Sequence, residues 1–322
     1  MVARESPTSA KIYNFKFQIF MMWFLIATLG YALLAVVFIL DKLIVSKSIS
    51  KPVVYTFYST IFMFGALFAL PIIDFGILSG VDWLWAVFSG VSFGFGLWTI
   101  YIALKKGETT HISPFNGAMV TIFTYLAASF FLSETLDNIK LVGIVILVFS
   151  SLLLSFEKSK KHSGFHSGFV WAIISGLFFA ISHVSAKYLY DLYPFWTAFI
   201  WTRAFTGIVG LITLLFPAVW RSFKPKREES KTYARRHTMS IVIADKVLGV
   251  ISVICLQYAI AISSVTLVNA LVGMQYVLMF VLVYLLTKFL PKIFKEYFTK
   301  REFLVEVVAI VLVTLGLVLF VL

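Results

Sequence analysis

The sequence holds ten apolar runs, each long enough to cross the roughly 30 Å hydrocarbon layer of a bilayer as a helix. Of the 322 residues, 61% are hydrophobic and only 13% are charged, which is more apolar surface than a water-soluble chain of this length can bury. Because lipid offers no partners for open backbone groups, we predict an all-α integral membrane protein. The ten predicted transmembrane helices cover residues 17–40, 53–73, 83–104, 112–133, 139–156, 168–190, 195–217, 241–262, 265–287 and 302–322.

The two halves of the chain are similar in pattern. Residues 55–71 align without gaps with the segment that begins at Thr197, which places Gly65 opposite Gly207. Each half carries five predicted helices, an odd number, so the second half must enter the membrane upside down, as in the inverted repeats of secondary transporters. The predicted divisions are a first five-helix repeat at 1–156, a linker at 157–167, and a second five-helix repeat at 168–322 with a basic loop at 218–240.

The basic residues indicate an orientation in the membrane. Lys and Arg number 27 against 15 Asp and Glu, and they gather in short clusters between the apolar runs, as in membrane proteins rather than nucleic-acid binders. Connections after the odd-numbered runs hold 20 of these cations, and the opposite side holds four. The positive-inside rule therefore predicts a multi-pass protein of the cytoplasmic membrane with both termini outside.

Three motifs in the first half resemble the EamA-like repeat of the drug/metabolite transporter superfamily. They are the segment Ala103–Phe115, the turn Phe131–Leu136 and the run Lys140–Leu147, and the resemblance is looser in the second half. It implies ten helices as two inverted repeats, a central cavity and transport by alternating access. Many members are thought to keep their termini in the cytoplasm, which conflicts with the charge distribution.

Arg203 is the clearest candidate for substrate binding. It lies about two turns into the run at 195–217, too deep for comfortable exposure to lipid. It could bind an anionic group on a substrate, or it could reach the membrane interface through its flexible side chain. The equivalent position in the first half is Ile61, and this asymmetry argues against a purely packing role.

His183 and Lys187 are further candidates on one helix face. They are four residues apart in the run at 168–190. A histidine can relay protons near neutral pH, although one inside a helix bundle more often makes a single hydrogen bond. Lys187 could contact substrate or could anchor the helix at the interface.

Neutral polar and aromatic side chains are expected to line the central cavity. Such groups need partners in a low-dielectric interior, and each is more often bonded between helices than to a ligand. We expect the cavity to suit amphipathic or aromatic metabolites. The candidate substrate-binding residues of this kind are Trp98, Tyr101, Asn116, Tyr258, Gln275 and Tyr276.

Two features are expected to be structural. Glu134 follows the fourth run, next to a helix start, where a carboxylate favours the positive end of the helix dipole. Gly90 and Gly94 form a GxxxG pattern that lets helix backbones touch.

Several kinds of chemistry lack a signature. There is no P-loop for ATP, the five His residues are scattered, and Cys255 is the single cysteine, so we expect no metal, cofactor or catalytic residue. The sequence also shows no convincing carboxylate within a span, which leaves substrate exchange or uniport at least as open as proton antiport.

Two classes of function remain. The first is a secondary transporter, an exporter or exchanger of small organic metabolites, with membrane lipids as surroundings and a monomer or a dimer as the unit. The second is a membrane-embedded enzyme or lipid-handling protein that acts on an anionic head group through its basic loops. Such an enzyme would need clustered carboxylates or histidines at one membrane face, which this sequence lacks.

Overall fold

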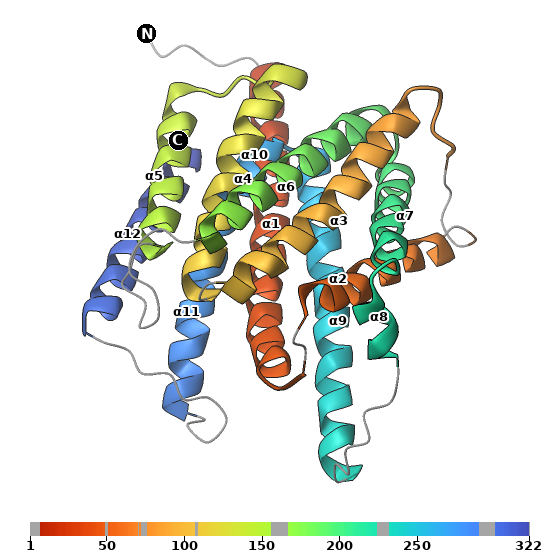
Figure 1. The fold of residues 1–322 in the computed structure, drawn as a ribbon. Coiled ribbons are helices and arrows are strands. Elements are labelled where there is room, and N and C mark those ends of the chain that lie inside the picture. Colours follow the sequence, from red (N-terminus) through yellow and green to blue (C-terminus); the bar gives the residue numbers. More distant parts are fainter. Residues whose placement is uncertain are drawn as a thin grey trace.

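In a computed structural model of the chain, the described residues form helices joined by short turns, with no strand among them (Figure 1). The described residues are 7–48, 51–69, 71, 76–106, 109–155, 167–223, 232–289 and 300–321. The elements are α1 (Pro7–Ser48), α2 (Pro52–Ile61), the 3₁₀ helix η1 (Phe62–Ala69), α3 (Asp82–Lys106), α4 (Thr109–Phe131), α5 (Asn138–Ser155), α6 (Ser167–Leu192), α7 (Phe195–Thr213), α8 (Pro217–Ser222), α9 (Thr232–Ile262), α10 (Val265–Ala270), α11 (Val272–Phe289) and α12 (Lys300–Val321).

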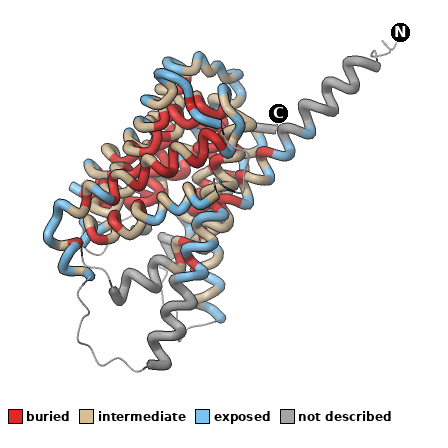
Figure 2. The backbone as a smooth tube through the Cα atoms, turned by 90° about the vertical axis from the view of Figure 1, so that its right-hand side faces the viewer, coloured by how far each residue is buried: buried red, intermediate tan, exposed pale blue. Residues whose placement is uncertain are grey.

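The elements confirm a helical multi-pass membrane protein. In the described part of the chain, nine segments are long and apolar enough to span a bilayer, and Leu304–Leu319 is a shorter apolar helix. Large apolar side chains cover the outside of the bundle, for example Phe68, Phe130 and Leu215, each more than 80% exposed. Figure 2 shows the buried residues gathered in the middle of the bundle. This arrangement is suited to lipid as the surrounding solvent.

Two of the predicted runs are not continuous α-helices. The second run changes from α-helix to 3₁₀ helix at Phe62, and the ninth is interrupted at Leu271 between α10 and α11. The sequence predicted neither change, because no proline or glycine stands at either position. The other predicted spans agree with helices of the structure to within a few residues, except that α1, α7 and α9 have different ends.

Helices from the first and second halves of the sequence pack against one another. α3 packs on α6 and α7, α4 on α6, α1 on α9, and α5 on α12. α1 begins and α12 ends at the same end of the bundle (Figure 1). The interior is therefore built from both halves.

The predicted contact at the GxxxG pattern is present in α3. A Cβ atom added at Gly90 would lie 2.4 Å from the backbone oxygen of Thr202, and one at Gly94 would lie 2.5 Å from Val209. The absence of side chains at these two positions thus lets α3 approach α7 closely. This approach fixes the position of α7, which carries Arg203.

Candidate functional site

Arg203 is buried inside the bundle, between aromatic rings. Its side chain is 1% exposed, and none of its three nitrogens has a hydrogen-bond partner among the described residues. Its guanidinium carbon lies 4.3 Å from the ring centre of Phe93 on α3 and 5.8 Å from that of Phe199 on α7. A cation can be held against aromatic faces in this way, but its N–H donors stay unsatisfied.

Phe93 brings Arg203 and His183 into one cluster. The ring of Phe93 lies 5.3 Å from Phe179 and 6.4 Å from His183, both on α6, and His183 also stacks on Phe179. The charge of Arg203 acts on His183. Two residues that the sequence predicted separately therefore share one site.

The hydrogen bonds of His183 define which of its nitrogens is a donor. The amide nitrogen of Asn269 donates to the backbone oxygen of Val265 over 2.8 Å, so the amide oxygen faces His183 Nδ1, also at 2.8 Å. Nδ1 therefore carries a proton, and in the neutral ring Nε2 is an acceptor. The site thus combines a permanent cation with a group that can accept a proton.

Asn269 stands next to the interruption between α10 and α11. Two side chains from the first half bind backbone oxygens there: Tyr31 donates to Val268 over 2.9 Å, and Thr121 donates to Asn269 over 3.2 Å. Open backbone groups at membrane depth need such partners. These hydroxyls hold the interruption in place beside His183.

Tyr190 extends the cluster on the side of α9. Its hydroxyl donates to Oε1 of Gln257 over 2.9 Å, and the charge of Arg203 acts on it. Tyr190, Phe93 and Phe199 were not among the predicted residues. The chain has 34 Phe and 14 Tyr, and nothing in the pattern separates these three from core residues.

The other predicted neutral residues make contacts of their own. Asn116 donates to the backbone oxygen of Ala172 over 2.9 Å, and Tyr276 donates to that of Ser113 over 2.6 Å, which joins neighbouring helices. Gln275 is 1% exposed.

Three predicted aromatic residues contact further aromatic or hydroxyl groups. Trp98 meets the ring of Phe216 at 5.3 Å, and Tyr258 meets that of Phe195 at 5.2 Å. Tyr101 donates to Ser59 on α2 over 3.1 Å. Whether these residues bind a substrate stays a prediction.

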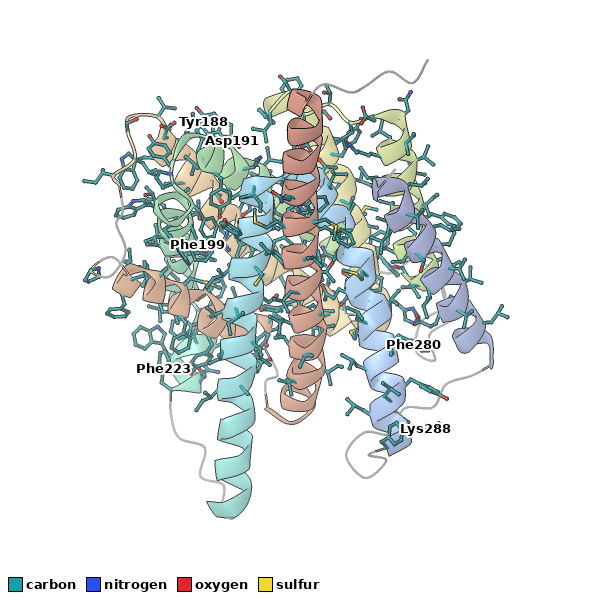
Figure 3. The ribbon with its side chains drawn as sticks, turned by 180° about the vertical axis from the view of Figure 1, so that it is seen from behind. Tyr188, Asp191, Phe199, Phe223, Phe280 and Lys288 are labelled. Atoms are coloured by element: carbon teal, nitrogen blue, oxygen red, sulfur yellow. The ribbon has the colours of Figure 1, made fainter. Side chains whose placement is uncertain are left out.

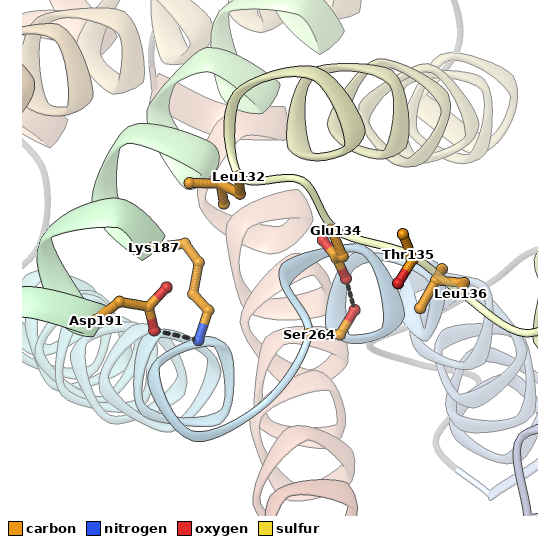
Figure 4. A pocket seen from close by; sticks show the side chains of 7 residues that line it. All are labelled: Leu132, Glu134, Thr135, Leu136, Lys187, Asp191 and Ser264. Atoms are coloured by element: carbon orange, nitrogen blue, oxygen red, sulfur yellow. Dashed lines mark hydrogen bonds and ion pairs between the residues drawn. The ribbon is translucent and has the colours of Figure 1, made fainter.

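Lys187 lies away from Arg203, at a small surface pocket near the end of α6. Its ammonium pairs with Asp191 at 2.8 Å and donates to the backbone oxygen of Ala261 over 3.2 Å. Figure 3 shows Asp191 near the end of the bundle and Phe199 deeper in it. The pocket, shown in Figure 4, has a volume of about 210 Å³ and is lined by Leu132, Glu134, Thr135, Leu136, Lys187, Asp191 and Ser264.

Glu134 joins the α4–α5 turn to the start of α10. Its carboxylate accepts hydrogen bonds from Ser264 Oγ and, over 3.0 Å, from Thr266 Oγ1. Ser264 in turn accepts from the backbone N–H of Leu267 as the N-cap of α10. Glu134 was predicted to favour the start of the following helix, but its carboxylate binds side-chain hydroxyls at the start of α10, in the other half of the chain.

The structure also corrects one sequence prediction. The spans were expected to hold no convincing buried carboxylate, yet Asp245 of α9 is 0% exposed. Its neighbours Ile243 and Val247 are both more than half exposed. Asp245 therefore points inward from a helix whose other face is open.

The fold and its polar interior define a class: a multi-pass helical membrane protein with ionisable groups held between its helices, as in transporters. In the comparison with known families, the model of the EamA-like transporter family matches residues 19–156, that is, α1 to α5. This segment is therefore similar to the EamA-like transporter family, the family that its motifs resemble. 

The likeness in fold extends beyond the matched segment. A solved structure titled "Crystal structure of protein" is similar with a TM-score of 0.61 and 15% sequence identity, over 92% of this chain and 94% of that chain. At this identity the likeness concerns the fold alone. No curated protein matches the sequence.

Proposed function

We propose that the chain is a secondary transporter that moves small organic anions or zwitterions across the cytoplasmic membrane. The observation that carries the proposal is the buried guanidinium of Arg203, which has no hydrogen-bond partner among the described residues. A buried charge of this kind is costly, and it is retained where it binds something. We further propose that the single chain is the unit of transport, as an exporter or exchanger.

The surroundings of Arg203 favour a ligand with a carboxylate. A guanidinium binds a carboxylate through two parallel N–H bonds, which would satisfy donors that the protein leaves open. The rings of Phe93 and Phe199 offer apolar faces beside it, and His183 offers one further polar contact. A metabolite with an anionic end and an apolar or aromatic body fits this combination.

Alternating access is supported by the way the halves of the chain meet. Helices of residues 1–156 pack on helices of residues 168–322, and Glu134 links the two at one end of the bundle. The interruption between α10 and α11 lies beside His183, and broken helices commonly surround transporter sites. We propose that the two halves rock about the Arg203 cluster.

The test is uptake into vesicles that contain the purified protein. A panel of radiolabelled carboxylic acids and amino acids is first screened by thermal shift, because ligands of the folded state raise its melting temperature. Uptake of any hit is then compared for the wild type, Arg203→Ala and Arg221→Ala, the last an exposed arginine at the end of α8.

We expect Arg203→Ala to abolish uptake and Arg221→Ala to leave it unchanged. Arg203→Lys should retain only weak uptake, because an ammonium cannot make the two parallel bonds. Full uptake by Arg203→Ala, with normal folding, would overturn the proposal.

A further inference from the structure

Asp245 forms a second buried polar site, on a different helix and at a different depth from Arg203. It lies 12 residues before Gln257 on α9, which is about 18 Å along the helix at 1.5 Å per residue. Gln257 contacts Tyr190 of the Arg203 cluster, so Asp245 is separated from that cluster along α9, toward the N-terminal end of the helix. The two sites are therefore separate.

The carboxylate of Asp245 has an unusual environment. Among the described residues, neither oxygen has a hydrogen-bond partner, although Lys246 Nζ lies 2.9 Å from Oδ2 outside hydrogen-bonding geometry. The side chain of Lys246 is 52% exposed, whereas that of Asp245 is 0% exposed. Asp245 is thus a fully buried carboxylate that has one adjacent ammonium and no hydrogen-bond donor among the described residues.

The ammonium of Lys246 lies over an aromatic ring of the first half. It lies 5.6 Å from the ring centre of Tyr55 on α2, and Tyr55 contacts Tyr101 on α3 at 4.5 Å between ring centres. Ser59 completes this group through its hydrogen bond with Tyr101. The Asp245–Lys246 pair thus lies where helices from both halves of the chain approach each other.

We propose that Asp245 is the residue that takes up and releases the proton coupled to transport. The step adds one proton from water to a carboxylate oxygen to give a neutral carboxylic acid, and the reverse step returns it to water. The neutral form removes the buried negative charge and releases Lys246 from the ion pair. This assignment rests on the proposed transport function and deepens it.

The same geometry disfavours a metal cation at Asp245. Sodium, calcium or magnesium needs several oxygen ligands, and among the described residues no group of three or more His, Cys, Asp or Glu side chains could hold a metal. The adjacent ammonium of Lys246 would also repel a metal ion. A proton needs only one oxygen.

The helices α1, α2 and α3 carry few titratable groups near Asp245 and Lys246. On α1, which packs along α9, residues 21–40 carry no charge, and the next charged residues, Asp41 and Lys42, have side chains outside the described part. On α2 and α3 the nearest such groups are Tyr55 and Tyr101.

The remaining helices that contact α9 contribute little charge near Asp245. On α6, Lys187 binds the backbone oxygen of Ala261, which follows Asp245 by 16 residues on α9. On α7 the charged group is Arg203, and α10 has none. Within the described part of the chain, Lys246 is the cation that lies at short range from Asp245.

The first test measures the proton itself and needs no substrate. Infrared difference spectra of the purified full chain are recorded between acidic and alkaline buffer, where a buried carboxylic acid gives its own C=O band. We expect Asp245→Asn to lose this band and Asp245→Glu to keep one. The control is Asp191→Asn, which removes a carboxylate that also pairs with a lysine but is 52% exposed.

An unchanged band in Asp245→Asn would overturn the assignment whether or not the protein proves to be a transporter. A second variant, Lys246→Gln, removes the neighbouring positive charge. The band should then change, because the carboxyl group loses its neighbouring ammonium 2.9 Å away. A band identical to that of the wild type would also contradict the assignment.

The second test separates coupling from transport. Vesicles are loaded with the radiolabelled acid found in the screen, and two fluxes are measured: exchange at equal pH on both sides, and accumulation driven by a pH gradient. We expect Asp245→Asn to keep exchange and to lose accumulation at least tenfold. Full accumulation in Asp245→Asn, or accumulation that follows a sodium gradient instead, would overturn the proposal.

Discussion

Replacing Arg203 by methionine should make the protein more stable while it stops transport. Methionine matches the length of the arginine stem, so it leaves little empty space between Phe93 and Phe199. A residue needed only for folding would behave in the opposite way, since its loss would destabilise the protein. The sign of the stability change therefore separates a binding role from a structural one.

The magnitude follows from the contacts of the guanidinium. The ring of Phe93 at 4.3 Å contributes about 2 kcal/mol in a dry site, and the more distant Phe199 contributes about 0.5 kcal/mol. Against this stand three buried nitrogens without partners, each of which costs about 1–3 kcal/mol. The difference is about 0.5–6.5 kcal/mol in favour of the replacement. Within this range we expect Arg203→Met to raise the free energy of unfolding by about 1–4 kcal/mol, as when other buried charges are replaced by apolar groups.

The measurement is thermal and denaturant unfolding of the detergent-purified variants, with uptake assayed on the same preparations. Arg203→Lys serves as the control, because it keeps the charge and should gain no stability. A lower melting temperature for Arg203→Met than for the wild type would refute the reasoning. It would mean that the aromatic contacts outweigh the unsatisfied donors.

Three further substitutions test the packing that holds the site. Gly90→Ala should lower the free energy of unfolding by about 1–3 kcal/mol, because its Cβ would lie 2.4 Å from the backbone of α7. The control is Gly249→Ala, which has no atom within 4 Å of the added Cβ and should not destabilise α9. Chemical unfolding compares the two variants. Glu134→Ala should cost about 1–3 kcal/mol by releasing Ser264 and the start of α10, and proteolysis of the α4–α5 turn should quicken. Tyr31→Phe removes the hydroxyl that donates to the Val268 carbonyl, which then keeps only the bond from Leu271 N–H over 3.2 Å, so a loss of about 0.5–1.5 kcal/mol is expected in thermal unfolding.

The membrane-spanning segments could be predicted from the sequence because their signal is long and repetitive. A run of about 20 apolar residues has few alternatives to a helix across the bilayer. The interruption at Leu271 could not be predicted in this way. It depends on hydroxyls of Tyr31 and Thr121 that reach it from distant parts of the chain.

The site was predictable only in part, for a related reason. Arg203 and His183 are unusual residues in apolar runs, so each was identified alone. Phe93 lies among many other phenylalanines, and only packing shows that it joins the two. Asp245 was missed because it stands beside Lys246 near the start of a run, where an interfacial ion pair is the ordinary interpretation.

At both the Arg203 cluster and the Asp245 site, the second half of the chain contributes the ionisable groups and the first half contributes aromatic rings. Arg203, His183 and Asp245 all come from residues after 167, whereas Phe93 and Tyr55, which face these ionisable groups or their neighbours, come from residues before 156. A rocking movement of one half against the other would therefore change the aromatic surroundings of both sites at once. The energy of a buried charge depends steeply on those surroundings. Such a movement would therefore change ligand binding at the Arg203 cluster and proton binding at Asp245 together. Coupled transport requires a link of this kind between the two binding events.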